Sequence, residues 1–248
     1  VIATGLVGGH NGARILDSMT AEGILNDFVR IRGESRTSTV VVDPTSSVQT
    51  EIYEYGPEIV QDELSLLVEK LRYLSGAITT VVLAGSLPRK VPTSFYADVV
   101  RDMGKRKVRT VVDCDGEPLR KALAMGPTLV SPSQREAEAL VGHEFQTDED
   151  FQLGLTQIAG MGAANVVITL KTGCYALLRS SRSRDRLYRA WIPQVESVAT
   201  VGSADALLAG FLSGLEAERE NEDVLKLALG CAAADLGGSL TVDGGPGG

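Results

Sequence analysis

Cysteine and histidine are scarce in this chain of 248 residues, which contains three cysteines and two histidines. Cys114, Cys174 and Cys231 lie far apart, and neither they nor His10 and His143 have the spacing of a zinc site. An odd number of separated cysteines also does not make a disulfide framework. We therefore expect a reducing, cytoplasmic location.

Positively charged residues are also outnumbered: the chain has 24 Lys and Arg but 32 Asp and Glu, which gives a net charge of −8. Binding to nucleic acid or to an anionic membrane requires a basic face, so neither is expected as a partner. No hydrophobic run is long enough to span a bilayer, and no signal-peptide pattern opens the sequence. An anionic small substrate remains compatible with this composition if arginine and lysine gather locally.

From residue 57 onward, apolar strands alternate with amphipathic helices. Strands are expected at 79–84, 108–113, 128–131 and 165–170, followed by two short β segments, and helices at 60–74, 94–104, 117–125, 134–141, 148–161, 203–219 and 222–236. Strands that are apolar throughout and separated by helices predict a parallel sheet covered on both faces. We expect a single α/β domain over residues 1–248.

The first fifth of the chain has a different pattern of apolar and polar residues. Residues 1–4 are apolar and predict a strand, and residues 12–22 have helical spacing. Residues 28–53 are rich in β-branched residues with polar alternation, which predicts a small antiparallel flap, or lid, inserted into the domain.

Polar or glycine-rich residues follow five of the expected strands. They lie at 85–88, at Asp113, and at 131–136, 171–173 and 202–205. In parallel sheets, ligands bind beyond the carboxyl ends of the strands. These segments therefore predict a binding site along one edge of the sheet.

The last of these segments, Gly202-Ser203-Ala204-Asp205, is a glycine turn that opens a helix. Backbone N–H groups and the helix dipole favour an anion there, and the aspartate lies beside it. This pairing suits phosphoryl transfer, which needs a cradle for the phosphoryl group and a base for the accepting hydroxyl. An ordinary helix start, whose acid complements the dipole, is the alternative.

Six segments also carry a resemblance to a known family. They are LAGSLP (83–88), VVDCDG (111–116), LVSPSQRE (129–136), VGSAD (201–205), IRGESRT (31–37) and the stretch 49–59. In order and spacing they resemble the ribokinase-like sugar kinases, in the phosphofructokinase-B branch of 1-phosphofructokinase and tagatose-6-phosphate kinase. The resemblance implies a three-layer α/β/α ribokinase-like fold, with a mostly parallel central sheet and a small β lid.

The resemblance also implies roles for individual residues. Asp205 would be the catalytic base, and Gly202, Ser203 and Ala204 the anion hole; Arg36 and Ser86 would hold the phosphate of the sugar; Glu136 would organise Mg²⁺; Thr169, Lys171, Gly173, Ala233 and Gly237 would flank the nucleotide. Arginine suits phosphate because its planar guanidinium donates several hydrogen bonds. Local alternatives are a solvated flap edge for the neighbouring Arg30 and Arg32, a turn cap for Ser86 and a first-turn acid for Glu136.

The activity implied by the resemblance is transfer of the γ-phosphoryl group of ATP to a ketohexose phosphate. Fructose 1-phosphate, giving fructose 1,6-bisphosphate, is the first expectation and tagatose 6-phosphate the second. The lid would close over the sugar and pair with a second copy in a homodimer. The family's opening strand and Gly-Gly-Lys-Gly sugar-binding segment are not found in this sequence, so we expect the chain alone to bind sugar phosphate poorly.

Two other functions remain open. VVDCDG resembles the D-x-D-G motif of haloacid-dehalogenase-type phosphatases, in which Asp113 would be the nucleophile. A non-catalytic sugar- or nucleotide-binding relative of the kinases is the second alternative. It is suggested by Ala204 where the family has Gly, and by Ser131 and Ser133 where it has Lys and Asn.

Overall fold

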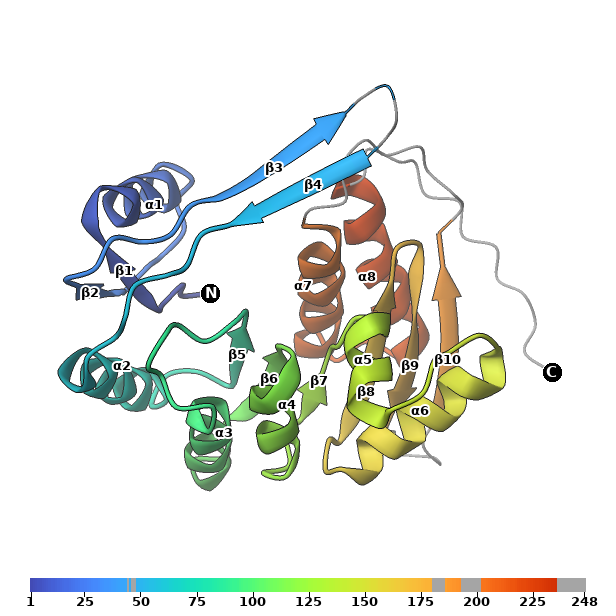
Figure 1. The fold of residues 1–248 in the computed structure, drawn as a ribbon. Helices are drawn as coiled ribbons and strands as arrows, with labels where there is room; N and C mark the ends of the chain where they lie inside the picture. The colour runs from blue at the N-terminus through green and yellow to red at the C-terminus, as the bar shows by residue number, and fades with distance from the viewer. Residues whose placement is uncertain (44, 46–47, 180–185, 193–201, 236–248) are drawn as a thin grey trace.

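The computed structural model describes residues 1–43, 45, 48–179, 186–192 and 202–235. Within these residues, a six-stranded sheet has the order β10-β9-β8-β7-β6-β5 (Figure 1). The strands are β5 (Thr80–Ala84), β6 (Arg109–Asp113), β7 (Leu129–Val130), β8 (Asn165–Leu170), β9 (Gly173–Leu178) and β10 (Arg186–Trp191). β5 to β8 run parallel, whereas β9 and β10 are antiparallel to their neighbours. This is the mostly parallel sheet that the sequence predicts.

Helices cover both faces of this sheet (Figure 1). One face carries α3 (Phe95–Lys105), α4 (Gly116–Leu123), α5 (Gln134–Val141) and α6 (Asp148–Gly160), and the other carries α7 (Ser203–Glu216) and α8 (Asn221–Asp235). The neighbours Val111 and Val112 on β6 belong to different cores, one with α7 and α8 and the other with α3 to α6. Both are almost fully buried, as strands between two helical layers must be.

The N-terminal part forms a separate two-stranded parallel sheet, β1 (Leu6–Gly8) with β2 (Val29–Ile31). It is accompanied by α1 (Gly9–Ala21) and α2 (Gln61–Leu74). The strand predicted at residues 1–4 is wrong, because Ala3 makes only an isolated bridge with Asn26. Val1 and Ile2 are exposed, so their apolar character does not mark a core strand.

The segment predicted to form the flap divides between two structures. β3 (Ser38–Asp43) and β4 (Val48–Tyr53) pair antiparallel and form an arm at the upper edge of the molecule in Figure 1. Residues 29–31, by contrast, pair parallel with β1 rather than with the arm.

The helices α7 and α8 approach each other closely through glycine. A Cβ atom on Gly210 would lie 2.9 Å from the Cα of Ala228, and one on Gly214 would lie 3.0 Å from the Cα of Val224. The side chain of Phe211, between the two glycines, is fully buried. The position of α7 is therefore set by backbone contact with α8.

In the part of the chain that the structure describes, no helix combines the length and the apolar character needed to cross a membrane.

Candidate active site

The start of α7 has the geometry of an anion-binding helix terminus. Gly202 caps the helix in the left-handed conformation, with φ of 97°, and its carbonyl accepts the N–H of Ala206 at 2.8 Å. Ala204 does not have positive φ, so alanine is unstrained where the family has glycine. Asp205 lies in the first turn and is exposed. The first N–H groups of a helix have no acceptor within the helix. The start of α7 therefore offers N–H donors for an anion next to the carboxylate of Asp205.

Three carboxylates converge at the carboxyl edge of the sheet. Asp113 ends β6, Glu136 lies in the first turn of α5, and Asp205 lies in the first turn of α7. Burial, and then the charges of Asp205 and Glu136, raise the pKa of Asp113 to about 6. Asp113 is among the strand-end residues that the sequence predicts at this edge, but a chemical role was predicted for it only in the phosphatase alternative.

Glu136 is fixed in orientation by the helix that carries it. Its Oε2 accepts the N–H of Ser133 at 2.7 Å, and Ser133 Oγ accepts the N–H of Glu136 at 3.4 Å. This reciprocal cap stabilises the start of α5. Ser133 therefore has a structural task at the position where the family has asparagine.

Carboxylates suit Mg²⁺, which usually keeps several waters and takes one or two carboxylates together with substrate phosphates. Asp113 and Glu136 carry such carboxylates. Burial, followed by the charges of Asp205 and Glu136, raises the pKa of Asp113, and a bound cation would favour its ionised form. Among the described residues, no group of three or more His, Cys, Asp and Glu could enclose a metal ion by itself. The site therefore fits a Mg²⁺ ion that nucleotide phosphates help to hold.

The structure brings together the two residues assigned to the sugar phosphate. Arg36 lies between β2 and β3, and Ser86 follows β5. Arg36 Nη2 donates a hydrogen bond to Ser86 Oγ at 3.3 Å, and both side chains are exposed. Further guanidinium donors remain for an anion, because arginine carries five N–H groups.

Glu34 ties the segment that carries Arg36 to the start of α1. Its carboxylate accepts the N–H of Asn11 at 2.6 Å and that of His10 at 3.0 Å, and these two bonds lower its pKa. A Cβ atom on Gly9 would lie 1.8 Å from Glu34 Oε2, so this contact requires glycine. Glu34 lies in the segment 31–37 that carries the resemblance, but no role was predicted for it from the sequence.

The residues predicted to flank the nucleotide occupy two places. Thr169, Lys171 and Gly173 lie together where β8 ends and β9 begins. Thr169 is buried and its N–H donates to Pro132 at 2.9 Å, whereas Lys171 is exposed. A Cβ atom on Gly173 would lie 2.1 Å from the carbonyl oxygen of Ala190, so close packing against β10 already accounts for this glycine.

The remaining predicted positions are on or beyond α8. Ala233 is buried in the core formed with α7, and Gly237 lies outside the described residues. The nucleotide roles of these five positions therefore remain predictions.

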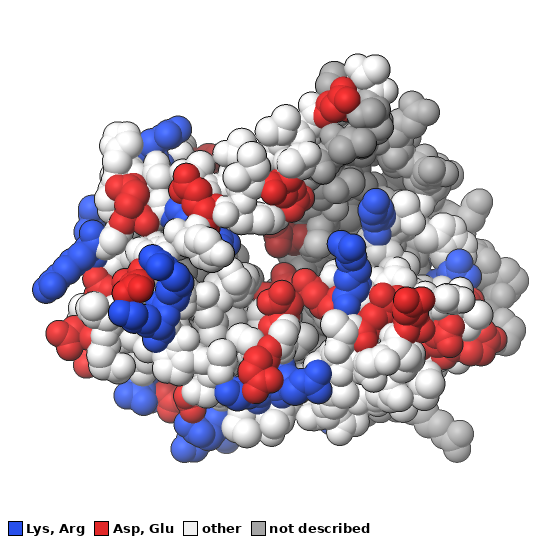
Figure 2. All heavy atoms as spheres, in the orientation of Figure 1, with Lys and Arg blue, Asp and Glu red and all other residues white. Residues whose placement is uncertain are grey.

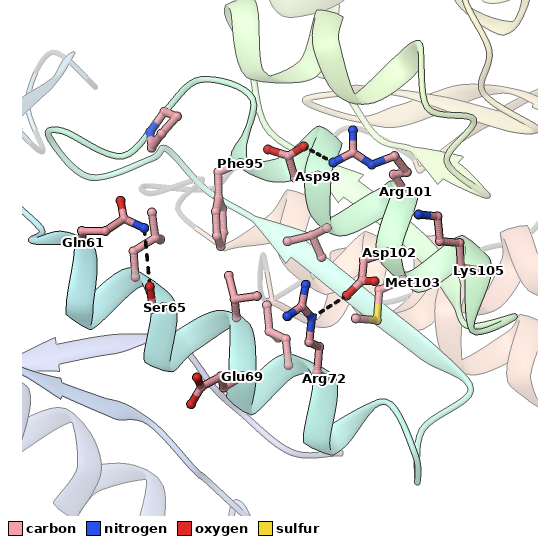
Figure 3. A pocket seen from close by; sticks show the side chains of 15 residues that line it. Gln61, Ser65, Glu69, Arg72, Phe95, Asp98, Arg101, Asp102, Met103 and Lys105 are labelled. Atoms are coloured by element: carbon pink, nitrogen blue, oxygen red, sulfur yellow. Dashed lines mark hydrogen bonds and ion pairs between the residues drawn. The ribbon is translucent and has the colours of Figure 1, made fainter.

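Figure 2 shows the molecule in the orientation of Figure 1. The surface is hollowed near its middle, and Asp and Glu side chains lie at the hollow. A different groove of about 540 Å³ lies between α2 and α3 (Figure 3). It is crossed by the ion pair of Arg72 Nε with Asp102 Oδ2 at 3.0 Å, and no predicted site residue lines it.

Comparisons with known proteins agree with this geometry. Residues 1–243 match the model of the family described as pfkB family carbohydrate kinase. The 1-phosphofructokinase of Borreliella burgdorferi is 28% identical over 233 residues, which are 94% of this chain and 73% of that protein. The structure of phosphofructokinase-2 from Escherichia coli in complex with substrates and products is 25% identical, with a TM-score of 0.85, over 95% of this chain and 76% of that one.

A possible 1-phosphofructokinase from Thermotoga maritima has the same fold, with a TM-score of 0.80 at 20% identity over 95% of this chain and 73% of that one. These likenesses confirm the predicted ribokinase-like α/β fold, and they favour a kinase over the phosphatase alternative for Asp113. The chain therefore belongs to the pfkB family of carbohydrate kinases.

Proposed function

We propose that this chain transfers the γ-phosphoryl group of ATP to a hydroxyl of a ketohexose phosphate, with fructose 1-phosphate as the first candidate and fructose 1,6-bisphosphate as the product. The observation that carries the proposal is the contact of Arg36 with Ser86, which makes a phosphate-recognition pair at the edge of the sheet where the carboxylates converge. The name of the Borreliella burgdorferi relative supports fructose 1-phosphate over tagatose 6-phosphate.

In the proposed reaction, the accepting hydroxyl oxygen attacks the γ-phosphorus and its proton passes to the carboxylate of Asp205. The bond from the γ-phosphorus to the bridging oxygen breaks, and ADP leaves. Backbone N–H groups at Gly202, Ser203 and Ala204 stabilise the charge on the transferred group, because the helix start adds partial positive charge. Glu136 would help to hold Mg²⁺ together with the nucleotide, and the ion would neutralise phosphate charge.

Arg36 and Ser86 hold the phosphate already present on the sugar. The guanidinium presents two parallel donors to phosphate oxygens, and the serine hydroxyl adds a third. Because both groups are exposed before the sugar binds, they meet the incoming anion directly. This anchor orients the sugar so that its free hydroxyl faces Asp205.

The arm formed by β3 and β4 is proposed to be the lid and the site of homodimer formation. Val41 and Ile52 are 54% and 55% exposed on one face, and Tyr53 is 62% exposed on the other. A two-stranded hairpin is marginally stable by itself, so burial of these side chains against a second copy would stabilise it. Sedimentation of the wild type as a dimer, and of Ile52→Lys as a monomer, would support this assembly; a wild-type monomer would contradict it.

The activity is tested by measuring ADP release from Mg-ATP with fructose 1-phosphate, tagatose 6-phosphate and fructose 6-phosphate in parallel. Asp205→Asn is expected to lower kcat by at least about 100-fold, as loss of a general base does. The matched control is Asp223→Asn, which removes a first-turn carboxylate of α8. A phosphatase is tested separately, by release of inorganic phosphate from a phosphorylated sugar: activity lost in Asp113→Asn but kept in Asp205→Asn would indicate the phosphatase.

Because this chain is expected to bind sugar phosphate poorly, the sugars are tested up to saturating concentrations. A folded wild-type chain that binds both ATP and a sugar phosphate but releases no ADP would contradict the proposal. That outcome would favour the non-catalytic binding relative, which Ser131 and Ser133 suggest by replacing the family's lysine and asparagine.

A further inference from the structure

The turn that follows Ser86 contains a residue in an unfavourable backbone conformation. The N–H of Val91 donates to the carbonyl of Pro88 at 3.2 Å, which closes a four-residue turn. Lys90, the third residue of this turn, has φ of 64°. Glycine usually occupies this position of a turn, because the Cβ atom of any other residue strains a backbone with positive φ. An interaction of the Lys90 side chain can offset part of this strain.

Glu58 supplies that interaction. Its Oε2 pairs with Lys90 Nζ at 2.6 Å, and its Oε1 lies 3.7 Å from Arg89 Nη1. The hydrogen bond with Lys90 is the largest cause of the lowered pKa of Glu58. The backbone adds to the contact, since the N–H of Ile59 donates to the carbonyl of Arg89 at 3.1 Å.

The residues just before Glu58 contact the segment that carries Arg36. Arg89 Nε donates to the carbonyl of Gly56 at 2.9 Å, and a Cβ atom on Gly56 would lie 3.8 Å from Arg36 Cδ. Pro57 packs so closely on Gly33 that a Cβ atom there would lie 2.4 Å from the proline ring. Residues 56–59 therefore lie between the two segments that supply Arg36 and Ser86.

We propose that Glu58 is a positioning residue for phosphate recognition, which binds Lys90 and Arg89 and so holds the turn after Ser86 at the place where Ser86 meets Arg36. This inference rests on the proposed function, because it takes Arg36 and Ser86 as the sugar-phosphate anchor. Glu58 does not touch the phosphate itself and acts through the turn. Its loss changes where Ser86 lies, without changing the carboxylates at Asp113 and Asp205.

The first test is kinetic. Glu58→Gln is expected to raise the KM for the sugar phosphate about fivefold, as expected for loss of an exposed ion pair, while kcat and the KM for ATP stay within about twofold. Lys90→Gly relieves the strain of the turn, so Glu58→Gln in that background is expected to cost at most about twofold. Asp98→Asn, which removes an exposed carboxylate 2.5 Å from Arg101 on α3, is the matched control. An unchanged sugar KM in Glu58→Gln, or an equal loss in the Lys90→Gly background, would overturn the proposal.

The second test does not depend on activity. Hydrogen exchange of the Ile59 and Val91 amides reports the turn directly, because they donate hydrogen bonds to its carbonyl groups at Arg89 and Pro88. Faster exchange in Glu58→Gln, and restored protection when Lys90→Gly is added, is the expected result. If no sugar stimulates ADP release by the wild type, the proposed function fails, while this exchange result still supports the role of Glu58 in the turn. Unchanged exchange in Glu58→Gln would overturn that role.

Discussion

Arg36 and Ser86 are 50 residues apart in the sequence, yet Arg36 Nη2 lies 3.3 Å from Ser86 Oγ. The arginine follows β2 of the small parallel sheet, whereas the serine follows β5 at the edge of the six-stranded sheet. An anion held by both side chains would therefore connect two sheets that share no strand. Ligand binding to this pair is expected to stabilise their arrangement by mass action.

Replacement of Arg36 tests the phosphate anchor. Arg36→Gln removes a charge-assisted pair of hydrogen bonds, which is worth about 1.5 to 3 kcal/mol, so the KM for the sugar phosphate is expected to rise about 10- to 100-fold. Arg30→Gln, at an exposed position of β2, is the control and should change this KM less than about twofold. Steady-state kinetics at saturating ATP measures both. A similar loss in the two variants would argue against a specific role for Arg36.

The raised pKa of Asp113 predicts a pH-dependent stability. Its ordinary pKa of 3.8 holds in the unfolded chain, and its pKa of about 6 holds in the folded protein. Between these values the folded protein keeps a proton that the unfolded chain has lost, so this carboxyl destabilises the fold increasingly as the pH rises to about 6. Asp113→Asn is therefore expected to stabilise the protein by about 1 to 2 kcal/mol at pH 7.5, and by little near pH 4.

Thermal or urea unfolding of Asp113→Asn and wild type at the two pH values measures this difference. Equal stabilisation at both would show that the charge of Asp113 is not its cause. Destabilisation at neutral pH would show that the carboxylate makes a favourable contact in the folded state.

Gly9 and Gly23 form a matched pair for testing the contact of Glu34 with α1. Both have positive φ, of 65° and 71°, but a Cβ atom meets Glu34 only at Gly9 and finds open space at Gly23. Gly23→Ala is expected to cost about 1 kcal/mol, from backbone strain alone. Gly9→Ala adds the loss of the helix cap and should cost about 2 to 3 kcal/mol. Chemical denaturation compares the two, and equal losses would mean that Glu34 contributes nothing as a cap.

Gly214 and Gly104 form a second pair, now within helices. A Cβ atom on Gly214 would lie 3.0 Å from the Cα of Val224, whereas one on Gly104 meets nothing within 4 Å. Gly104→Ala is therefore expected to stabilise the protein by about 0.5 to 1 kcal/mol, through helix propensity. Gly214→Ala should destabilise it by about 1 to 3 kcal/mol, because α7 must move away from α8. Melting temperatures measure both, and stabilisation by Gly214→Ala would contradict the close packing.

Regular elements could be predicted closely from the sequence, because their patterns are local. α5 and β8 have the bounds expected from helical spacing and from a continuous apolar run. The strand expected at 1–4 failed because apolar residues at an exposed end produce the same pattern as a core strand. β7 is only two residues long, although four were expected.

At the candidate site, the positions of Asp113 at a strand end and of Asp205 at a helix start could be predicted from the sequence. The roles that the resemblance implies for Arg36 and Asp205 stay predictions. Features of the site that depend on contacts between distant parts of the sequence could not be predicted. The positive φ of Lys90 could not be predicted, since lysine does not mark a left-handed turn. The coupling of Asp113 to Asp205 and Glu136 depends on burial and distance, which no local pattern contains.

The backbone contact between α7 and α8 has a mechanical consequence for the proposed base. A helix rises 1.5 Å per residue, so Asp205 lies about 14 Å along α7 from Gly214. Over this length a helix behaves as a stiff rod, and close-packed interiors transmit displacement rather than absorb it. A shift where Gly210 and Gly214 meet α8 is therefore expected to move the carboxylate of Asp205 as well. The orientation proposed for Asp205 would thus depend on glycines that lie far from the carboxylate itself.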